Sequence, residues 1–218
     1  MKFFIDTANL NEIREAQALG ILDGVTTNPT LMAKEGITGK KNIIAHYEEI
    51  CKIVDGDISA EVISIDYEGM IREGDEYAQI DDKIIIKIPM IKEGLKAIKY
   101  FADKGIKTNT TLVFTAGQAL MAAKAGTSYV SPFIGRLDDI AYDGLELIGQ
   151  LRLIFDNYAI DTEILAASIR HTMHIIKSAE LGADVATCPL KAILGLLNHP
   201  LTDKGLEQFI ADGKKLGL

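Results

Sequence analysis

Short runs of consecutive apolar residues recur along the chain, and longer stretches with apolar residues at steps of three and four separate them. Several runs are continuously apolar rather than alternating, which is typical of parallel strands covered on both faces. The predicted strands cover residues 3–5, 24–26, 58–63, 84–88, 108–113, 128–132, 163–167 and 184–187. Strands that alternate with helices in this way indicate either a closed barrel or a doubly wound open sheet.

The segments between the strands have the spacing of amphipathic helices. The apolar faces on which this prediction rests are Ile91, Leu95, Ile98 and Phe101; Leu147, Ile148, Leu151, Ile154 and Phe155; and Met173, Ile176 and Ala179. Residues 202–218 follow the last strand–helix unit, and Leu206, Phe209 and Ile210 predict a helix there that must cover an apolar surface. We therefore expect one domain over residues 1–218, with 202–218 as a C-terminal helical extension.

Two features favour a (β/α)₈ barrel of the α/β class over the open sheet. Polar, reactive residues lie at or near the C-terminal ends of most predicted strands, where barrel enzymes build their sites. The chain also has no G-x-G-x-x-G sequence after its first strand, so the signature of dinucleotide binding is missing.

Composition and charge narrow the range of partners. The net charge is −8 with no cluster of Lys and Arg, which argues against binding to nucleic acid. No apolar run approaches the roughly 20 residues that span a bilayer, and the N-terminus does not resemble a secretory signal. The two cysteines, Cys51 and Cys188, lie far apart and form no C-x-x-C pair. We expect a cytoplasmic protein with reduced thiols that acts on small molecules.

A lysine interrupts the most apolar predicted strand, Ile-Ile-Ile-Lys87-Ile-Pro. A lysine is almost never buried without a partner. One explanation is a side chain that reaches outward from a strand edge or pairs with a buried carboxylate. The other is a Schiff-base nucleophile, because desolvation disfavours the ammonium form and would lower the lysine pKa.

Residues two apart on a strand share a face, so polar side chains can be assigned to common faces. Such pairs are Asn109 with Thr111 on the fifth predicted strand, Ser131 with Phe133 on the sixth, and Ser168 with Arg170 at the end of the seventh. Asp6 closes the first strand, and Glu61 interrupts the third. If these faces look into the mouth of the barrel, their side chains converge with Lys87 on one cavity.

Seven segments together resemble the transaldolase family, and most closely its short-chain branch, which also contains the fructose-6-phosphate aldolases. They are Phe-Ile-Asp6-Thr-Ala, Gly24-Val-Thr-Thr-Asn28-Pro29, Ala60-Glu61-Val, Lys87-Ile-Pro, Asn109-Thr-Thr111-Leu-Val, Ser131-Pro-Phe133-Ile-Gly-Arg136 and Ala-Ala-Ser168-Ile-Arg170. The resemblance runs in register from residue 1 to about residue 205.

The resemblance implies a role for each matching position. Lys87 matches the Schiff-base lysine, and Asp6 the general acid/base that takes the proton of the C4 hydroxyl. Glu61 and Thr111 match the pair that holds a catalytic water. The positions that match substrate-binding residues are Asn28, Asn109 and Ser131 for the dihydroxyacetone moiety, and Arg136, Ser168 and Arg170 for the phosphate. No metal and no cofactor is implied, because a Schiff base itself serves as the electron sink.

Two positions separate the branches of the family. The aldolases that this chain resembles carry glutamine in place of Glu61 and tyrosine in place of Phe133, so the resemblance favours transfer over free aldol cleavage. It also implies a homo-oligomer, a ring-shaped pentamer or a pair of rings that forms a decamer.

Two other functions are considered. A metal-dependent aldolase would need histidine ligands, but His171 and His174 are better explained by helix-face or capping roles. A non-catalytic sugar-phosphate-binding barrel would not need both Lys87 and Asp6.

Overall fold

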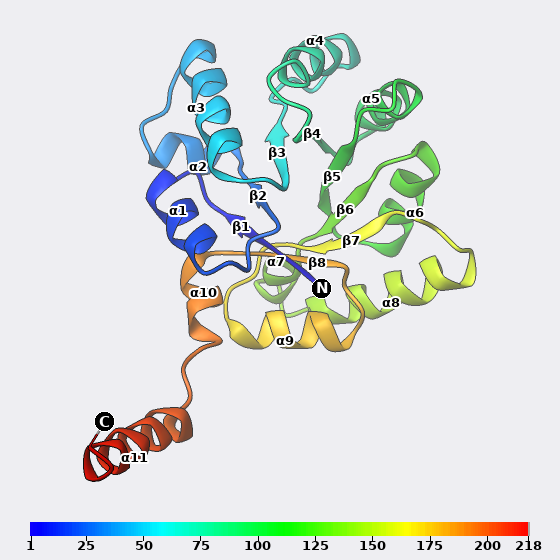
Figure 1. The fold of residues 1–218 in the computed structure, drawn as a ribbon. Helices are drawn as coiled ribbons and strands as arrows, with labels where there is room; N and C mark the ends of the chain where they lie inside the picture. The colour runs from blue at the N-terminus through cyan, green and yellow to red at the C-terminus, as the bar shows by residue number, and fades with distance from the viewer. Residues whose placement is uncertain (218) are drawn as a thin grey trace.

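The computed structural model describes residues 1–217 and has the predicted (β/α)₈ architecture (Figure 1). Eight parallel strands close into a barrel, since β1 pairs with β8 as well as with β2. The strands are β1 (Lys2–Asp6), β2 (Gly24–Thr26), β3 (Asp57–Glu61), β4 (Ile84–Pro89), β5 (Thr108–Val113), β6 (Tyr129–Pro132), β7 (Glu163–Ala166) and β8 (Val185–Cys188). Each lies within one or two residues of its predicted position, and the barrel prediction is confirmed.

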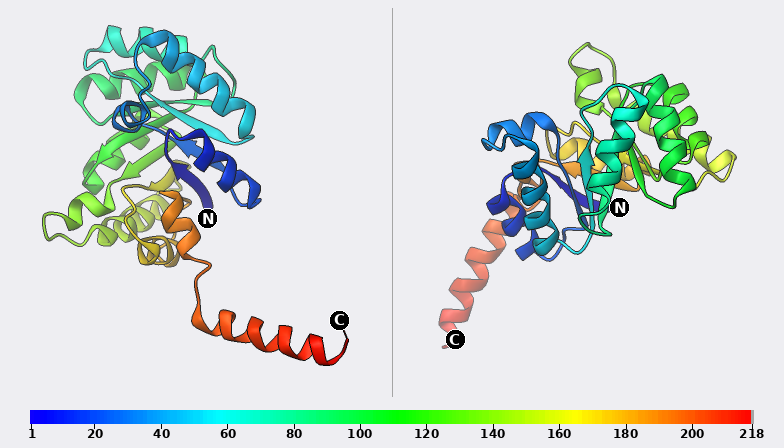
Figure 2. Two further views of the ribbon diagram at one scale, coloured as in Figure 1. Left: turned by 90° about the vertical axis from the view of Figure 1, so that its left-hand side faces the viewer. Right: turned by 90° about the horizontal axis from the view of Figure 1, so that it is seen from above.

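Helices surround the barrel and cover the outer faces of the strands (Figures 1 and 2). They are α1 (Leu10–Ala18), α2 (Pro29–Lys34), α3 (Lys40–Ile53), α4 (Tyr67–Tyr77), α5 (Lys92–Asp103), α6 (Ala116–Ala125), α7 (Ile134–Asp138), α8 (Gly144–Asn157), α9 (Thr172–Glu180), α10 (Leu190–Gly195) and α11 (Pro200–Lys215). Outward-facing strand residues such as Ile5, Ile58 and Ile86 are fully buried against these helices. This packing explains why several strands are continuously apolar.

Side chains that point inward form layers along the barrel axis. Phe4, Ile85, Tyr129, Leu165 and Val185 pack into one apolar layer inside the barrel. At a side-chain period of two, the next inward positions toward the carboxyl ends of the strands are mostly polar. They are Asp6, Lys87, Ser131 and Thr187, with Ala167 as the apolar exception. The apolar layer therefore forms a floor beneath a polar chamber.

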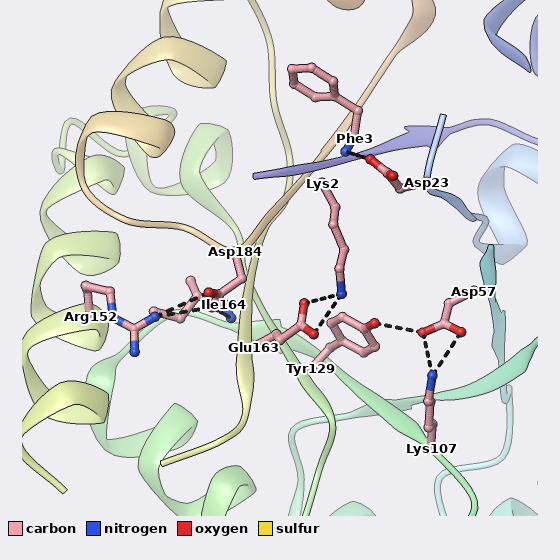
Figure 3. Close-up of polar contacts among 10 residues, drawn as sticks. All are labelled: Lys2, Phe3, Asp23, Asp57, Lys107, Tyr129, Arg152, Glu163, Ile164 and Asp184. Atoms are coloured by element: carbon pink, nitrogen blue, oxygen red, sulfur yellow. Dashed lines mark hydrogen bonds and ion pairs between the residues drawn. The ribbon is translucent and has the colours of Figure 1, made fainter. Parts of the chain in front are cut away.

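Charged side chains close the opposite, N-terminal end of the barrel (Figure 3). Lys2 pairs with Glu163 at 2.8 Å, and Lys107 pairs with Asp57 at 3.1 Å. The Tyr129 hydroxyl donates to Asp57 at 2.7 Å. These contacts line a cavity of about 790 Å³ and join strands that are not neighbours. Since the charged groups at this end satisfy one another, we assign them to barrel stability rather than to chemistry.

Helix α9 packs on a face other than the predicted one. His174, Ile175 and Ser178 are buried, whereas Met173 and Ile176 are exposed, so the face predicted from Met173 and Ile176 is wrong. Apolar residues occur on two sides of this helix. The spacing alone therefore could not show which side faces the barrel.

Helix α11 extends away from the barrel after a short linker (Figure 2). It has no buried residue, and Leu206, Phe209 and Ile210 are 58%, 76% and 52% exposed. The prediction of a helix over 202–218 is confirmed for residues 202–215; residues 216 and 217 form a turn, and residue 218 lies outside the described residues. Among the described helices, none has both the length and the apolar character needed to cross a membrane.

Candidate active site

Lys87 lies inside the barrel on β4, with its side chain in the polar chamber. The residue is only 5% exposed, and its Nζ donates to the carbonyl oxygen of Thr27 at 2.9 Å. Nζ also lies 3.1 Å from Glu61 Oε2. The parallel register pairs Glu61 with Lys87 on neighbouring strands, so both side chains point inward. A buried carboxylate partner is one of the explanations that the sequence offers for Lys87, and Glu61 is such a partner.

Asp6 ends β1 and enters the same chamber, and the register places it beside Thr26 on β2. The Thr26 hydroxyl donates to Asp6 Oδ1 at 2.8 Å. Burial raises the pKa of the Asp6 carboxyl above its ordinary value, while the charge of Lys87 and the hydrogen bond from Thr26 partly oppose that rise. Asp6 is therefore a carboxyl group whose protonation depends on its immediate neighbours.

A cavity of about 140 Å³ opens at the carboxyl ends of the strands. Its lining consists of Asp6, Thr26, Asn28, Lys87, Ser131, Phe133, Arg136, Ala167, Ser168 and Thr187. The sequence predicts all of these as site residues except Thr26, Ala167 and Thr187. The Asn28 side chain accepts a hydrogen bond from the backbone N–H of Leu31 at 3.0 Å and thereby caps α2. This bond uses the carboxamide oxygen and holds the side chain at the rim of the cavity.

Two further predicted residues, Asn109 and Thr111, point inward from β5 but do not line the cavity. Asn109 is fully buried, accepts a hydrogen bond from the Ser131 hydroxyl at 2.7 Å and donates to Ser59 at 3.1 Å. It therefore orients Ser131. The Thr111 hydroxyl is buried and has no hydrogen-bond partner among residues 1–217. An unpaired buried hydroxyl is costly, which makes Thr111 a candidate for holding a small polar molecule.

The predicted phosphate-binding residues lie on one side of the mouth. Arg136 extends from α7, with its guanidinium carbon 5.5 Å from the centre of the Phe133 ring. Ser168 lines the cavity, whereas Arg170 donates to Asp139 at 2.6 Å. The prediction that Ser168 and Arg170 share a strand face is wrong. β7 ends at Ala166, and Ser168 has a φ of +58°, so strand alternation does not extend to these residues.

His174 holds the segment that carries Arg170. Its Nδ1 accepts from the backbone N–H of Arg170 at 3.3 Å, and its Nε2 lies 3.0 Å from Asp138. His171 is the N-cap residue of α9. In the part of the chain that the structure describes, no group of three or more His, Cys, Asp or Glu side chains could hold a metal ion.

The sequence analysis missed Thr26 and Thr187 as site residues. Their hydroxyl oxygens lie 2.6 Å apart, and both residues are buried in the lining of the cavity. The alternation rule could have found them, because Thr26 is two residues after Gly24 and Thr187 is two after Val185, at the ends of β2 and β8.

The fold and the site together define a class. A (β/α)₈ barrel with a buried lysine and a carboxyl group in a chamber at the carboxyl ends of its strands has the architecture of a barrel enzyme. The fold by itself leaves the chemistry open. Two solved structures agree with this fold: a dihydrodipicolinate synthase from Rhodopseudomonas palustris (TM-score 0.62, 15% identity, 86% of this chain and 69% of that one) and a thiamine phosphate pyrophosphorylase from Pyrococcus furiosus (TM-score 0.60, 14% identity, 86% and 85%).

Sequence comparison is more specific. The profile of the Transaldolase/Fructose-6-phosphate aldolase family matches residues 3–217. A protein named "Probable transaldolase" from Cytophaga hutchinsonii is 71% identical over 216 residues, and one of the same name from Flavobacterium psychrophilum is 68% identical over 215. Each match covers 99% of both chains. The chain therefore belongs to the transaldolase/fructose-6-phosphate aldolase family and is an enzyme of the transaldolase type.

Proposed function

We propose that this enzyme transfers a dihydroxyacetone unit between sugar phosphates of the pentose phosphate pathway through a Schiff base on Lys87. The donor is sedoheptulose 7-phosphate or fructose 6-phosphate, and the acceptor is glyceraldehyde 3-phosphate or erythrose 4-phosphate. The proposal depends chiefly on one observation: the buried Lys87 Nζ lies 3.1 Å from Glu61, in a chamber that also contains Asp6.

Schiff-base formation requires an uncharged amine and the loss of one water. Glu61 is within reach of the Lys87 ammonium and is the natural acceptor of its proton. The free amine adds to the C2 carbonyl of the donor to give a carbinolamine, and loss of the C2 hydroxyl as water leaves the iminium. Glu61 and the unpaired hydroxyl of Thr111 are the proposed partners of the water that moves protons during this step.

Carbon–carbon cleavage then uses Asp6 as the base. Asp6 takes the proton of the C4 hydroxyl, the C3–C4 bond breaks, and its electron pair moves into the iminium to give an enamine. The aldose phosphate leaves with a new carbonyl at C4. The enamine carbon next adds to the aldehyde of the acceptor, Asp6 returns its proton, and hydrolysis of the new iminium frees Lys87.

The polar groups around the chamber have binding roles in this scheme. Asn28 and the Asn109–Ser131 pair hold the hydroxyls of the three-carbon unit. Arg136, Ser168 and Arg170 bind the phosphate, because a guanidinium is always charged and matches phosphate geometry. Arg170 would exchange Asp139 for the phosphate. That exchange costs little, because both partners of the existing pair are about half exposed.

Phe133 and Glu61 support transfer over release of dihydroxyacetone, which is the activity of a fructose-6-phosphate aldolase. The Phe133 ring lines the cavity and packs against Phe114, with ring centres 5.7 Å apart. It offers no hydroxyl that could orient a water against the intermediate. The intermediate is then left for an acceptor aldehyde.

We also propose that residues 1–218 act as one domain in a cytoplasmic homo-oligomer, a pentamer or decamer, in which α11 packs on an adjacent subunit. The exposed apolar side chains of α11 support this, since such a stripe is typical of an interaction surface.

Steady-state assays with Lys87→Met test the proposed activity. The variant should lose transfer from fructose 6-phosphate to erythrose 4-phosphate, whereas calorimetry should still detect binding of fructose 6-phosphate. Lys191→Met alters an exposed lysine on α10 and serves as the matched control, with activity near that of the wild type. Full activity of Lys87→Met would refute the Schiff base, and dominant release of dihydroxyacetone by the wild type would identify an aldolase.

A further inference from the structure

Asp6 is the end of a short chain of buried hydroxyl groups. Thr26 Oγ1 lies 2.8 Å from Asp6 Oδ1 and 2.6 Å from Thr187 Oγ1. Thr26 is 1% exposed and Thr187 is 3% exposed. The register of the barrel explains the arrangement, because β1 pairs with β2 on one side and with β8 on the other.

The number of available protons determines which group donates in each hydrogen bond between Asp6, Thr26 and Thr187. A threonine hydroxyl has one proton to donate and can accept from others. When Asp6 is ionised, Thr26 must use its proton for the carboxylate, so Thr187 must donate to Thr26. When Asp6 is protonated on Oδ1, both bonds can reverse, with Asp6 donating to Thr26 and Thr26 donating to Thr187.

We propose that Thr26, supported by Thr187, positions Asp6 for proton transfer in the reaction described above. The hydrogen bond from Thr26 occupies Oδ1 and favours the ionised carboxylate, which leaves Oδ2 to meet the substrate hydroxyl. The hydroxyl chain keeps the buried groups paired in both protonation states of Asp6, because protonation on Oδ2 leaves Oδ1 to accept from Thr26, and protonation on Oδ1 reverses both bonds. Thr26 and Thr187 act through Asp6 and are positioning residues.

Other charged or ionisable groups near Asp6 lie on several strands and helices. Lys87 on β4 carries the facing charge, and Glu61 on β3 partly neutralises it. Arg136 on α7 lines the same cavity, and the Cys188 thiol on β8 is close enough for Asp6 to contribute to the rise in its pKa. None of these groups forms a hydrogen bond with Asp6 in the described part of the chain. The Thr26 hydroxyl is therefore the group whose removal has the most direct effect on the pKa of Asp6.

Removing the Thr26 hydroxyl should therefore raise the pKa of Asp6. Because Asp6 acts as a base, activity falls when Asp6 is protonated, so the acidic limb of the kcat/KM profile should move to higher pH. In Thr26→Val we expect a shift of about 1 pH unit, as for one lost hydrogen bond to a charged group. Thr26→Ser should keep the wild-type profile, and Thr187→Val should shift the limb in the same direction by less.

The experiment measures pH profiles of transfer for these variants and, in parallel, borohydride trapping of fructose 6-phosphate. Thr110→Val is the matched control, because among residues 1–217 its buried hydroxyl bonds to Thr127 alone, and Thr127 does not line the cavity that contains Asp6. Trapping should survive in every variant, and only the Thr26 and Thr187 valine variants should shift the profile.

An unshifted profile in Thr26→Val, or an equal shift in Thr110→Val, would overturn the inference while leaving the Schiff base intact. Absence of trapping in the wild type would instead refute the proposed function on which this inference rests. If Thr26→Val does not fold, Thr187→Val and Thr26→Ser decide. An unshifted Thr187→Val or a shifted Thr26→Ser would then contradict the proposal.

Discussion

The Lys87 Nζ atom has two oxygen neighbours, the carbonyl of Thr27 at 2.9 Å and the carboxylate of Glu61 at 3.1 Å. A buried ion pair contributes little to stability, because desolvation of both charges offsets their attraction. Leaving one charge without its partner typically costs about 3–5 kcal/mol. The pair therefore contributes little to stability, and in the proposed mechanism Glu61 accepts the proton of Lys87 inside the polar chamber.

Replacing Thr111 allows an effect on activity to be distinguished from an effect on stability. Thr111→Val removes a buried group that has no hydrogen-bond partner among residues 1–217, so the free energy of unfolding should stay the same or increase. The rate of Schiff-base formation should fall by about 100-fold if Thr111 takes part in the proton relay. Urea unfolding and single-turnover trapping measure the two effects.

Thr110→Val is again the matched control. It loses hydrogen bonding to Thr127, so it should lose about 1 kcal/mol of stability and keep its activity. A Thr111→Val enzyme that is destabilised and fully active would contradict the assigned role.

At the scale of single residues, the sequence predicts most of the residues that line or support the cavity, because they lie on strands. Alternation along a strand is strict while the strand lasts, so Asn109, Thr111 and Ser131 point inward as predicted. It fails at Ser168, which lies beyond the end of β7 in the left-handed region. The hydroxyl chain from Thr187 to Asp6 depends on the closure of β8 onto β1, which strand patterns do not reveal.

Among the elements, the segment between β7 and α9 has the most direct influence on the proposed phosphate site. Gly135 at the start of α7 packs under this segment, since a Cβ there would lie 2.4 Å from the Ser168 carbonyl oxygen and 2.7 Å from the Arg170 side chain. His174 ties the segment to α7 through Asp138. Helices α7 and α9 thus converge on the loop that carries Arg170.

The protonation state of His174 should affect the stability of this loop. Burial lowers the pKa of His174 from its ordinary value, and the nearby His171 lowers it further, so the folded state favours the neutral ring. The unfolded chain binds a proton near the ordinary pKa of about 6.5. Stability should therefore fall as the pH drops from about 6.5 toward the lowered pKa of the folded state.

Urea unfolding at several pH values between about 5 and 7.5 tests this linkage in the wild type and in His174→Gln. The variant lacks the titrating group, so its stability should depend less on pH, and the gap between the two proteins should narrow in acid. Its KM for fructose 6-phosphate should also rise, because a glutamine side chain does not place its acceptor oxygen where Nδ1 accepts from the Arg170 N–H. Stability curves that run parallel would contradict the role given to His174.

Helix faces are harder to predict than strands in this chain. On α9 the buried side contains His174 and Ser178, and the more apolar Met173 and Ile176 lie on the exposed side. Hydrophobic spacing identifies the side that avoids water, but it does not say whether the barrel or another surface covers that side. The wrong prediction for α9 follows from this ambiguity.

At the scale of the whole molecule, α11 is the one helix or strand among residues 1–217 that has no buried residue. The 16-residue helix has four large exposed apolar side chains, Leu201, Leu206, Phe209 and Ile210. This exposure is unfavourable unless another surface covers them. Replacing Phe209 and Ile210 with serine should shift the protein to a smaller assembly, with the barrel still folded.

Light scattering coupled to gel filtration measures the mass, and circular dichroism checks the fold. Gln208→Ser, on the opposite face of α11, should keep the wild-type mass. An unchanged mass in the Phe209→Ser/Ile210→Ser protein would contradict the proposed packing of α11 on an adjacent subunit.

The central claim concerns the amine of Lys87, and mapping the covalent adduct tests it most directly. The protein is incubated with fructose 6-phosphate, reduced with borohydride, digested and analysed by mass spectrometry. We expect a reduced three-carbon or hexose phosphate adduct on Lys87, and none on Lys83, which donates to the carbonyls of Cys51 and Val54, or on the exposed Lys191. An adduct on another lysine, or no adduct from an active enzyme, would contradict the account.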